Sequence, residues 1–290
     1  MLHSLHRNEP MYLASILVVL TAAAVLAAAP AGAARSRQTH PPLKLAVPPS
    51  PETDARVERE VARAQAVLDR MDIAAIFDSP YLASAVYYHD GFLDDYPDER
   101  PDGNPARRII ARVSRQLTPE RKARYIELLH RACAPPAAAG ARRYVVPVRY
   151  AEPRGHRNPH RYALDLFAAE GSPVYSAASA VVVLAESNWT RGDPFSTSTE
   201  RGGNSVIVFN PETGRFFRYC HLAAAEVRAG QAVEAGGRIG TVGHTGADAS
   251  RRGHGRHLHF EVNQYDGTRV RPLTAAELRT LVRGWLARGD

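Results

Sequence analysis

The run HLHFEV at residues 257–262 puts two histidines, His257 and His259, two positions apart. In a β-strand alternate residues point to the same face, so both imidazoles would project into one space while the apolar residues between and after them face the core. Two imidazoles side by side suit a metal site, because one can coordinate the ion while the other moves protons next to it. The run therefore predicts a strand that carries a metal-assisted reaction centre.

Two other residues could take part in the same chemistry. Asp165 stands in the half-apolar run RYALDL, and a buried aspartate is costly unless a cation lies nearby. His221 follows Tyr219 and Cys220, and strand alternation would put its imidazole on the face opposite Cys220. Taken singly, these residues also fit a core histidine, a capping aspartate or a surface imidazole. They indicate a reaction centre only if the fold brings them close together in space.

In this order, the residues resemble the lysostaphin-type (LytM) zinc metallopeptidases. The pattern of that family is a histidine, an aspartate shortly after it, a middle histidine followed by leucine, and a terminal HxH. The resemblance covers about residues 143–265 and extends to scaffold runs such as GSPVYSA at 171–177 and GHTG at 243–246. It implies a mainly β catalytic domain, a LytM-like duplicated hybrid motif in an antiparallel β-sandwich or barrel, with Zn²⁺ as cofactor.

By this resemblance the zinc ligands are a first histidine, Asp165 and His259, and the residues that assist catalysis are His221 and His257. Three protein ligands leave a fourth coordination position open, which is the arrangement of a catalytic zinc. The resemblance thus implies a zinc-dependent endopeptidase that hydrolyses peptide cross-links of bacterial peptidoglycan. The alternative is a catalytically inactive relative that binds the cell wall or activates an amidase.

The first histidine is the point at which the sequence departs from the family. The common spacing is HxxxD, but Arg161 stands four residues before Asp165, and arginine does not ligate zinc. The preceding loop offers His156 and His160. We prefer His156, because a branch of the family with a longer turn before a similar strand has its ligand there. His160 has the wrong strand parity relative to Asp165 unless a bulge intervenes.

Charge and composition limit the partners. The chain has 290 residues, 44% of them hydrophobic, which is enough for one well-buried domain and a smaller one. Its formal net charge is +7, and the only lysines are Lys44 and Lys122. No basic stripe interleaved with aromatic residues is present, so nucleic acid is not the expected partner. A polyanionic cell envelope fits the charge, and the resemblance adds peptidoglycan peptide stems as substrate.

The first residues predict export. A short polar start with Arg7 precedes an apolar run over about residues 13–29, and the small residues Ala31 and Ala33 follow. This is typical of a signal peptide over residues 1–34, and a retained N-terminal anchor that tethers the protein to the membrane is the alternative. The expected location is periplasmic or extracellular.

The rest of the chain divides by composition and periodicity. Residues 35–52 form a Pro-rich linker, 53–134 a helical region, 141–272 the LytM-like zinc peptidase domain, and 273–290 a C-terminal helix. We expect helices over residues 53–75 and 105–116 and an acidic loop at 94–99. A third helix should begin at Pro119, with Thr118 as its N-cap, and run toward 133. The expected strands span residues 144–150, 162–167, 180–186, 205–210, 216–221, 238–242 and 257–263.

Three further features of the sequence concern the C-terminal helix, the cysteines and the role of the helical region. Thr274 and Glu277 form a capping box that predicts the start of the C-terminal helix. Cys133 and Cys220 are the only cysteines, and they form either one bridge or two separate buried thiols. The helical region either restrains access to the catalytic groove or serves as a passive spacer or partner-docking module that holds the peptidase at the right distance from the membrane.

Overall fold

The computed structural model describes residues 50–88, 104–133, 144–151, 160–191, 193–197, 201–246, 249–250 and 255–287. These residues all belong to one compact unit. The expected signal peptide or anchor and the expected acidic loop lie outside them. Within the described part of the chain, no helix has both the length and the apolar character needed to cross a membrane.

Within the described residues, the helical region contains four α-helices and one short 3-10 helix. They are α1 (Pro51–Arg70), η1 (Ala75–Phe77), α2 (Pro80–Tyr88), α4 (Pro105–Ser114) and α5 (Pro119–Ala132). Helix α1 begins two residues earlier than predicted because the Ser50 hydroxyl caps it by accepting from the Thr53 amide at 3.1 Å. The cap of α5 at Thr118 is confirmed. Helix α2 was not predicted, because all of its residues after Pro80 are buried and the sequence has no polar face to mark its period.

The β region consists of two antiparallel sheets. The larger has seven strands in the order β1-β9-β5-β4-β3-β7, with β10 pairing with β9, and the smaller has the order β2-β8-β6. The strands are β1 (Ala163–Phe167), β2 (Pro173–Tyr175), β3 (Ala180–Glu186), β4 (Ser205–Asn210), β5 (Arg215–Cys220), β6 (Leu222–Ala225), β7 (Ala232–Val233), β8 (Arg238–Val242), β9 (His257–Tyr265) and β10 (Val270–Pro272). The expected fold class, a mainly β domain preceded by a small helical region, is confirmed.

Most long strands lie where the sequence predicted them, and one does not exist. Residues 144–150 were expected to form a strand, but this segment joins the sheet only through a bridge between Ala151 and Phe167. Pro147 has no amide hydrogen to give to a ladder, and its carbonyl instead accepts from the Tyr175 amide at 2.8 Å. The short strands β2, β6, β7 and β10 were missed.

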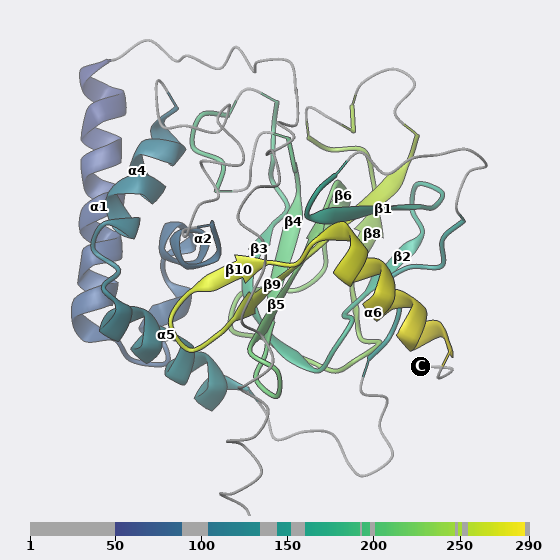
Figure 1. Ribbon diagram of the computed structural model, residues 1–290. Coiled ribbons are helices and arrows are strands. Elements are labelled where there is room, and N and C mark those ends of the chain that lie inside the picture. Colours follow the sequence, from purple (N-terminus) through teal and green to yellow (C-terminus); the bar gives the residue numbers. More distant parts are fainter. Residues whose placement is uncertain are drawn as a thin grey trace, which may run out of the picture. The chain divides into compact units, whose positions relative to one another are not determined.

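The two faces of the large sheet are buried by different parts of the chain. Alternate residues of β4 show the division: Ile207 and Phe209 pack with the helices, whereas Val206 and Val208 pack with the small sheet and helix α6 (Ala275–Ala287). We call the first the helix-covered face and the second the sandwich face. Figure 1 shows α1, α2, α4 and α5 on one side of the large sheet and α6 on the other.

Two expected local details are decided by the structure. The capping box of α6 is confirmed: the Glu277 amide donates to the Thr274 hydroxyl at 3.3 Å, and the Thr274 amide donates to the Glu277 carboxylate at 2.6 Å. Cys133 and Cys220 are free thiols, so the single bridge does not form. Cys133 Sγ lies 3.8 Å from the Phe209 carbonyl oxygen instead.

Candidate metal and catalytic site

Strand pairing brings the predicted residues together on the helix-covered face. Asp165 of β1 lies directly opposite His259 of β9. Cys220 of β5 lies opposite the same histidine from the other side. Directly opposite residues of an antiparallel pair share a face, so residues far apart in the sequence converge on one sheet surface, near the edge formed by β1.

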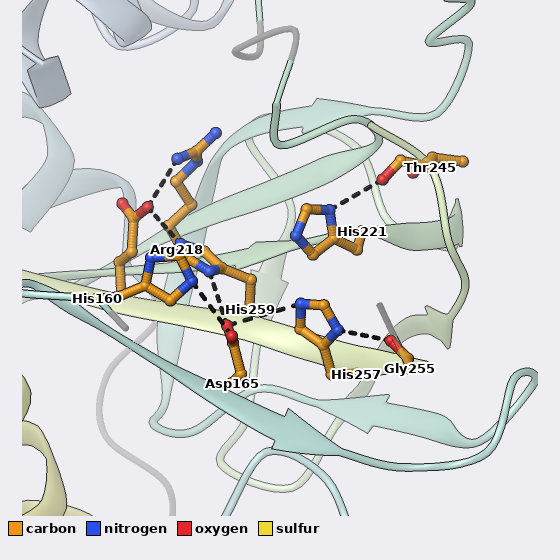
Figure 2. A network of polar contacts seen from close by, with 9 residues as sticks. His160, Asp165, Arg218, His221, Thr245, Gly255, His257 and His259 are labelled. Carbon is orange, nitrogen blue, oxygen red and sulfur yellow. Dashed lines mark hydrogen bonds and ion pairs between the residues drawn. The ribbon is translucent and has the colours of Figure 1, made fainter. Parts of the chain in front are cut away.

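A carboxylate between two imidazoles forms the candidate metal group. His259 Nδ1 lies 3.0 Å from Asp165 Oδ1, and His160 Nε2 lies 3.2 Å from Asp165 Oδ2. The ligand atoms of these three residues all lie within 4.8 Å of one another. Figure 2 shows the imidazoles of His160 and His259 next to each other, both joined to the Asp165 carboxylate by dashed lines. Asp165 is enclosed, with a side chain only 2% exposed.

Of the two candidates for the first zinc ligand, His156 and His160, the structure places His160 beside Asp165. His156, the preferred candidate, belongs to residues 152–159, which lie outside the described part of the chain. The alternative candidate, His160, stands beside Asp165. The parity objection to it does not apply, because β1 begins at Ala163 and His160 precedes the strand. A residue outside a strand is not bound by strand alternation.

Two more imidazoles, His257 and His221, lie beside this group. Their ring centroids are 4.8 Å apart, and His257 Nε2 lies 3.6 Å from Asp165 Oδ1. In each ring Nδ1 lies 2.9 Å from a backbone carbonyl oxygen, that of Gly255 for His257 and that of Thr245 for His221. A carbonyl oxygen only accepts, so Nδ1 of each ring carries a hydrogen and donates it, and Nε2 is left as the nitrogen that can exchange a proton.

His221 reaches the site by a route that strand alternation does not predict. It lies between β5 and β6 with a backbone φ of 64°, in the left-handed region that residues other than glycine seldom adopt. Its ring centroid is 5.6 Å from that of His259, which is paired with Cys220. The expectation that His221 faces away from the side of Cys220 was therefore wrong. Such a backbone conformation at a reactive centre is a recurrent feature of functional sites.

Close packing of two glycine loops supports His221. Gly246 has a φ of 91°, and a Cβ atom there would lie 2.2 Å from the Arg201 carbonyl oxygen. A Cβ atom at Gly203, which has a φ of 65°, would lie 2.4 Å from backbone atoms of Thr245 and Gly246. Only glycine permits both the positive φ and this approach of the two backbones. The Thr245 carbonyl is thereby held where it accepts the Nδ1 hydrogen of His221.

Burial and neighbouring groups set the protonation of the site. Burial alone would raise the pKa of Asp165, but hydrogen bonds from His160 and His259 hold that pKa well below its usual range. Burial, together with the adjacent His257 and His259, lowers the pKa of His221, so His221 is neutral. Burial also acts to lower the pKa of His259, but Asp165 and Glu261 raise it to about 9. Without a metal, His259 is thus a cation between two carboxylates.

These donors fit a zinc ion. Two imidazole nitrogens and one carboxylate oxygen are the ligand set of a three-ligand zinc centre. The enclosed Asp165 carboxylate is also a charge that a cation would neutralise. A metal ion at His259 Nδ1 would take the place of the proton there, so the two imidazoles and the carboxylate could hold it without rearranging the sheet.

Sequence reasoning missed a buried polar group next to the ligands, formed by Glu261, Arg218 and Tyr87. Glu261 follows His259 by two residues on the same face of β9, and strand alternation could have identified it. Arg218 is a charged residue in the middle of the mainly apolar strand β5, which was a second signal. Tyr87 comes from the unpredicted helix α2 and left no signal.

The β region is similar to known peptidases. Residues 159–272 match the profile of Peptidase family M23. The chain is 36% identical over 104 residues to peptidoglycan DD-endopeptidase ShyA of Vibrio cholerae. The aligned region covers 36% of this chain and 20% of that protein, so the chain spans about a fifth of this relative's length. The family resemblance inferred from the sequence is confirmed for this part of the chain.

Solved structures of such peptidases are also similar. A zinc-containing peptidase from Vibrio cholerae is 28% identical with a TM-score of 0.30, and the match covers 46% of this chain and 34% of that one. The antimicrobial peptidase lysostaphin from Staphylococcus simulans is 23% identical with a TM-score of 0.33, and the match covers 48% of this chain and 49% of that one.

Proposed function

Starting from the match of residues 159–272 to Peptidase family M23, we propose that this protein is a zinc-dependent endopeptidase that hydrolyses peptide cross-links of bacterial peptidoglycan. The observation that carries the proposal is the enclosed Asp165 carboxylate within hydrogen-bond distance of His160 and His259. The similarity to a peptidoglycan DD-endopeptidase supports the substrate class. Such a substrate requires export, to the periplasm or to the cell exterior, through the N-terminal segment.

We assign the zinc ligands to His160, Asp165 and His259. When bound, the ion supplies Lewis-acid chemistry: it polarises the scissile carbonyl and lowers the pKa of the attacking water. The chain's part is to hold the ion by these three side chains at the β1 edge of the large sheet, where strand pairing fixes Asp165 opposite His259. Ligands on paired strands keep their spacing better than ligands on free loops.

His257 and His221 would move protons. Each ring donates its Nδ1 hydrogen to a backbone carbonyl, so Nε2 is the nitrogen that would accept a proton from the attacking water and later donate one to the leaving amine. Once protonated, either ring also stabilises negative charge on the former carbonyl oxygen. The lowered pKa of His221 keeps that imidazole in its basic form at neutral pH.

The test measures zinc content and turnover of purified peptidoglycan by the full chain. We expect about one zinc per chain, and Asp165→Ala should lose the zinc and the activity together. Glu170→Ala is the matched control, because this nearby carboxylate is exposed and pairs with His244 and Arg256 instead. A wild-type protein without zinc would refute the proposal. Zinc binding without turnover would favour an inactive wall-binding or amidase-activating relative.

Single alanine variants separate the histidines by role. His160→Ala should lose zinc and His156→Ala should keep it, whereas the reverse result would assign the first ligand to His156. His257→Ala and His221→Ala should keep zinc while kcat falls by about 10² to 10⁴-fold, the usual contribution of a general acid or base. Equal zinc loss in all four variants would contradict these roles.

A further inference from the structure

Helix α2 docks on the β region through one row of hydroxyl groups. Tyr81, Ser84 and Tyr87 are spaced three residues apart and so lie along one side of the helix. The first two donate to backbone carbonyls of the loop after β3: Tyr81 to Phe195 at 2.8 Å and Ser84 to Thr197 at 3.1 Å. The third donates to a side chain of β9 instead.

That side chain is Glu261, whose two oxygens have separate partners. Tyr87 Oη donates to Oε2 at 2.8 Å. Arg218 Nη1 and His259 Nε2 both lie 2.9 Å from Oε1. The side chains of Glu261 and Arg218 are only 13% and 3% exposed, so their ion pair is shielded from water. The Asn263 side-chain amide also donates to the Tyr87 carbonyl at 3.2 Å, which ties the end of α2 to the same strand.

This arrangement decides which nitrogen of His259 faces the metal group. An ionised carboxylate only accepts hydrogen bonds, so His259 Nε2 must carry a hydrogen and donate it to Glu261. The other ring nitrogen, Nδ1, points to Asp165 and is the atom left to coordinate. A carboxylate behind a ligating histidine fixes the ring's tautomer and orientation.

Resting on the proposed function, in which His259 is a zinc ligand, we infer that the helical region completes the metal site. Tyr87 and Arg218 hold Glu261, and Glu261 positions the imidazole of His259, so a residue of α2 tunes the affinity for zinc from outside the M23-like segment. The helical region is then a working part of the peptidase centre.

Zinc affinity of the full-length protein tests this, measured by competition with a chelator. Glu261→Gln should weaken zinc binding by about 10- to 100-fold, and Tyr87→Phe by about 3- to 10-fold, because it removes one of the hydrogen bonds that hold the carboxylate. Tyr81→Phe is the matched control: it removes a buried hydroxyl of the same helix that bonds the β region away from Glu261.

Two further readouts separate positioning from general destabilisation. Thermal unfolding of the metal-free proteins should show similar losses for Tyr87→Phe and Tyr81→Phe, since each loses one buried hydrogen bond. The visible spectrum of the cobalt-substituted protein should change in Tyr87→Phe and not in Tyr81→Phe. If wild type binds zinc and the two tyrosine variants bind it equally well, the inference is wrong and the proposed function stands. If wild type binds none, both are wrong.

Discussion

The two faces of the large sheet differ in where their cover comes from. The sandwich face is buried by the small sheet, by α6 and by the segment that begins at Tyr144, all from the second half of the chain. The helix-covered face carries the candidate site, and its cover includes α1, α2, α4 and α5 from residues 51–132. The small sheet lies within the M23-like segment, residues 159–272, whereas α1, α2, α4 and α5 all precede that segment and α6 follows it. The face that holds the chemistry is therefore completed by the part of the chain that the family match leaves out.

Strand composition explains why the second cover is needed. All six residues of β4 are buried, and so are the first five of β3. Strands that are apolar on both faces must be covered on both. In a protein with one wet face, alternate positions of these strands would be polar. The sequence of β3 and β4 thus already requires a second layer, although it does not say which segment supplies it.

The largest effect should come from removing the helical layer. A chain shortened to begin at residue 141 would expose the apolar side chains of the helix-covered face, which are Val181, Val183, Ile207, Phe209 and Phe216. We expect the shortened chain to aggregate and to lose a cooperative thermal transition. The free energy lost when these side chains are exposed is comparable with the whole stability of a domain, about 5–15 kcal/mol. Gel filtration and calorimetry check this, with a chain that begins at residue 36 as control. A monomeric short chain with a sharp transition would show that the layer is dispensable.

A smaller effect compares the faces directly. Phe209 on the helix-covered face and Phe217 on the sandwich face are both completely buried. Each phenylalanine-to-alanine change should cost about 3–5 kcal/mol of unfolding free energy, measured by denaturant titration. A cost below about 1 kcal/mol for Phe209→Ala alone would mean that the helices do not pack tightly on the sheet.

The smallest effect concerns the sandwich face only. Thr274→Ala removes the hydroxyl that caps α6 and should lower the unfolding free energy by about 1 kcal/mol. Thr274→Ser keeps a hydroxyl and should be close to wild type. Identical stability of the two variants would show that the cap contributes nothing.

The sequence by itself determined the features that depend on near neighbours. Alternation along β9 identified His257 and His259 as residues of one face, and the run around Asp165 identified a carboxylate in an apolar strand. Caps at Thr118 and Thr274 located two helix starts. These features rest on spacings of two to four residues, which a strand or a helix turns directly into geometry.

Only the tertiary structure decided the features that depend on distant partners. Tyr87 bonds to Glu261, 174 positions away in the sequence. Helix α2 is buried on all sides, so its sequence has no polar face that would have predicted a helix. His221 points into the site because its backbone turns into a left-handed conformation where β5 meets β6, which ends the alternation that sequence reasoning extends. Non-local packing and a single unusual φ leave no period in the sequence, so the carboxylate behind His259 and the helix that holds it appear only when the chain is folded.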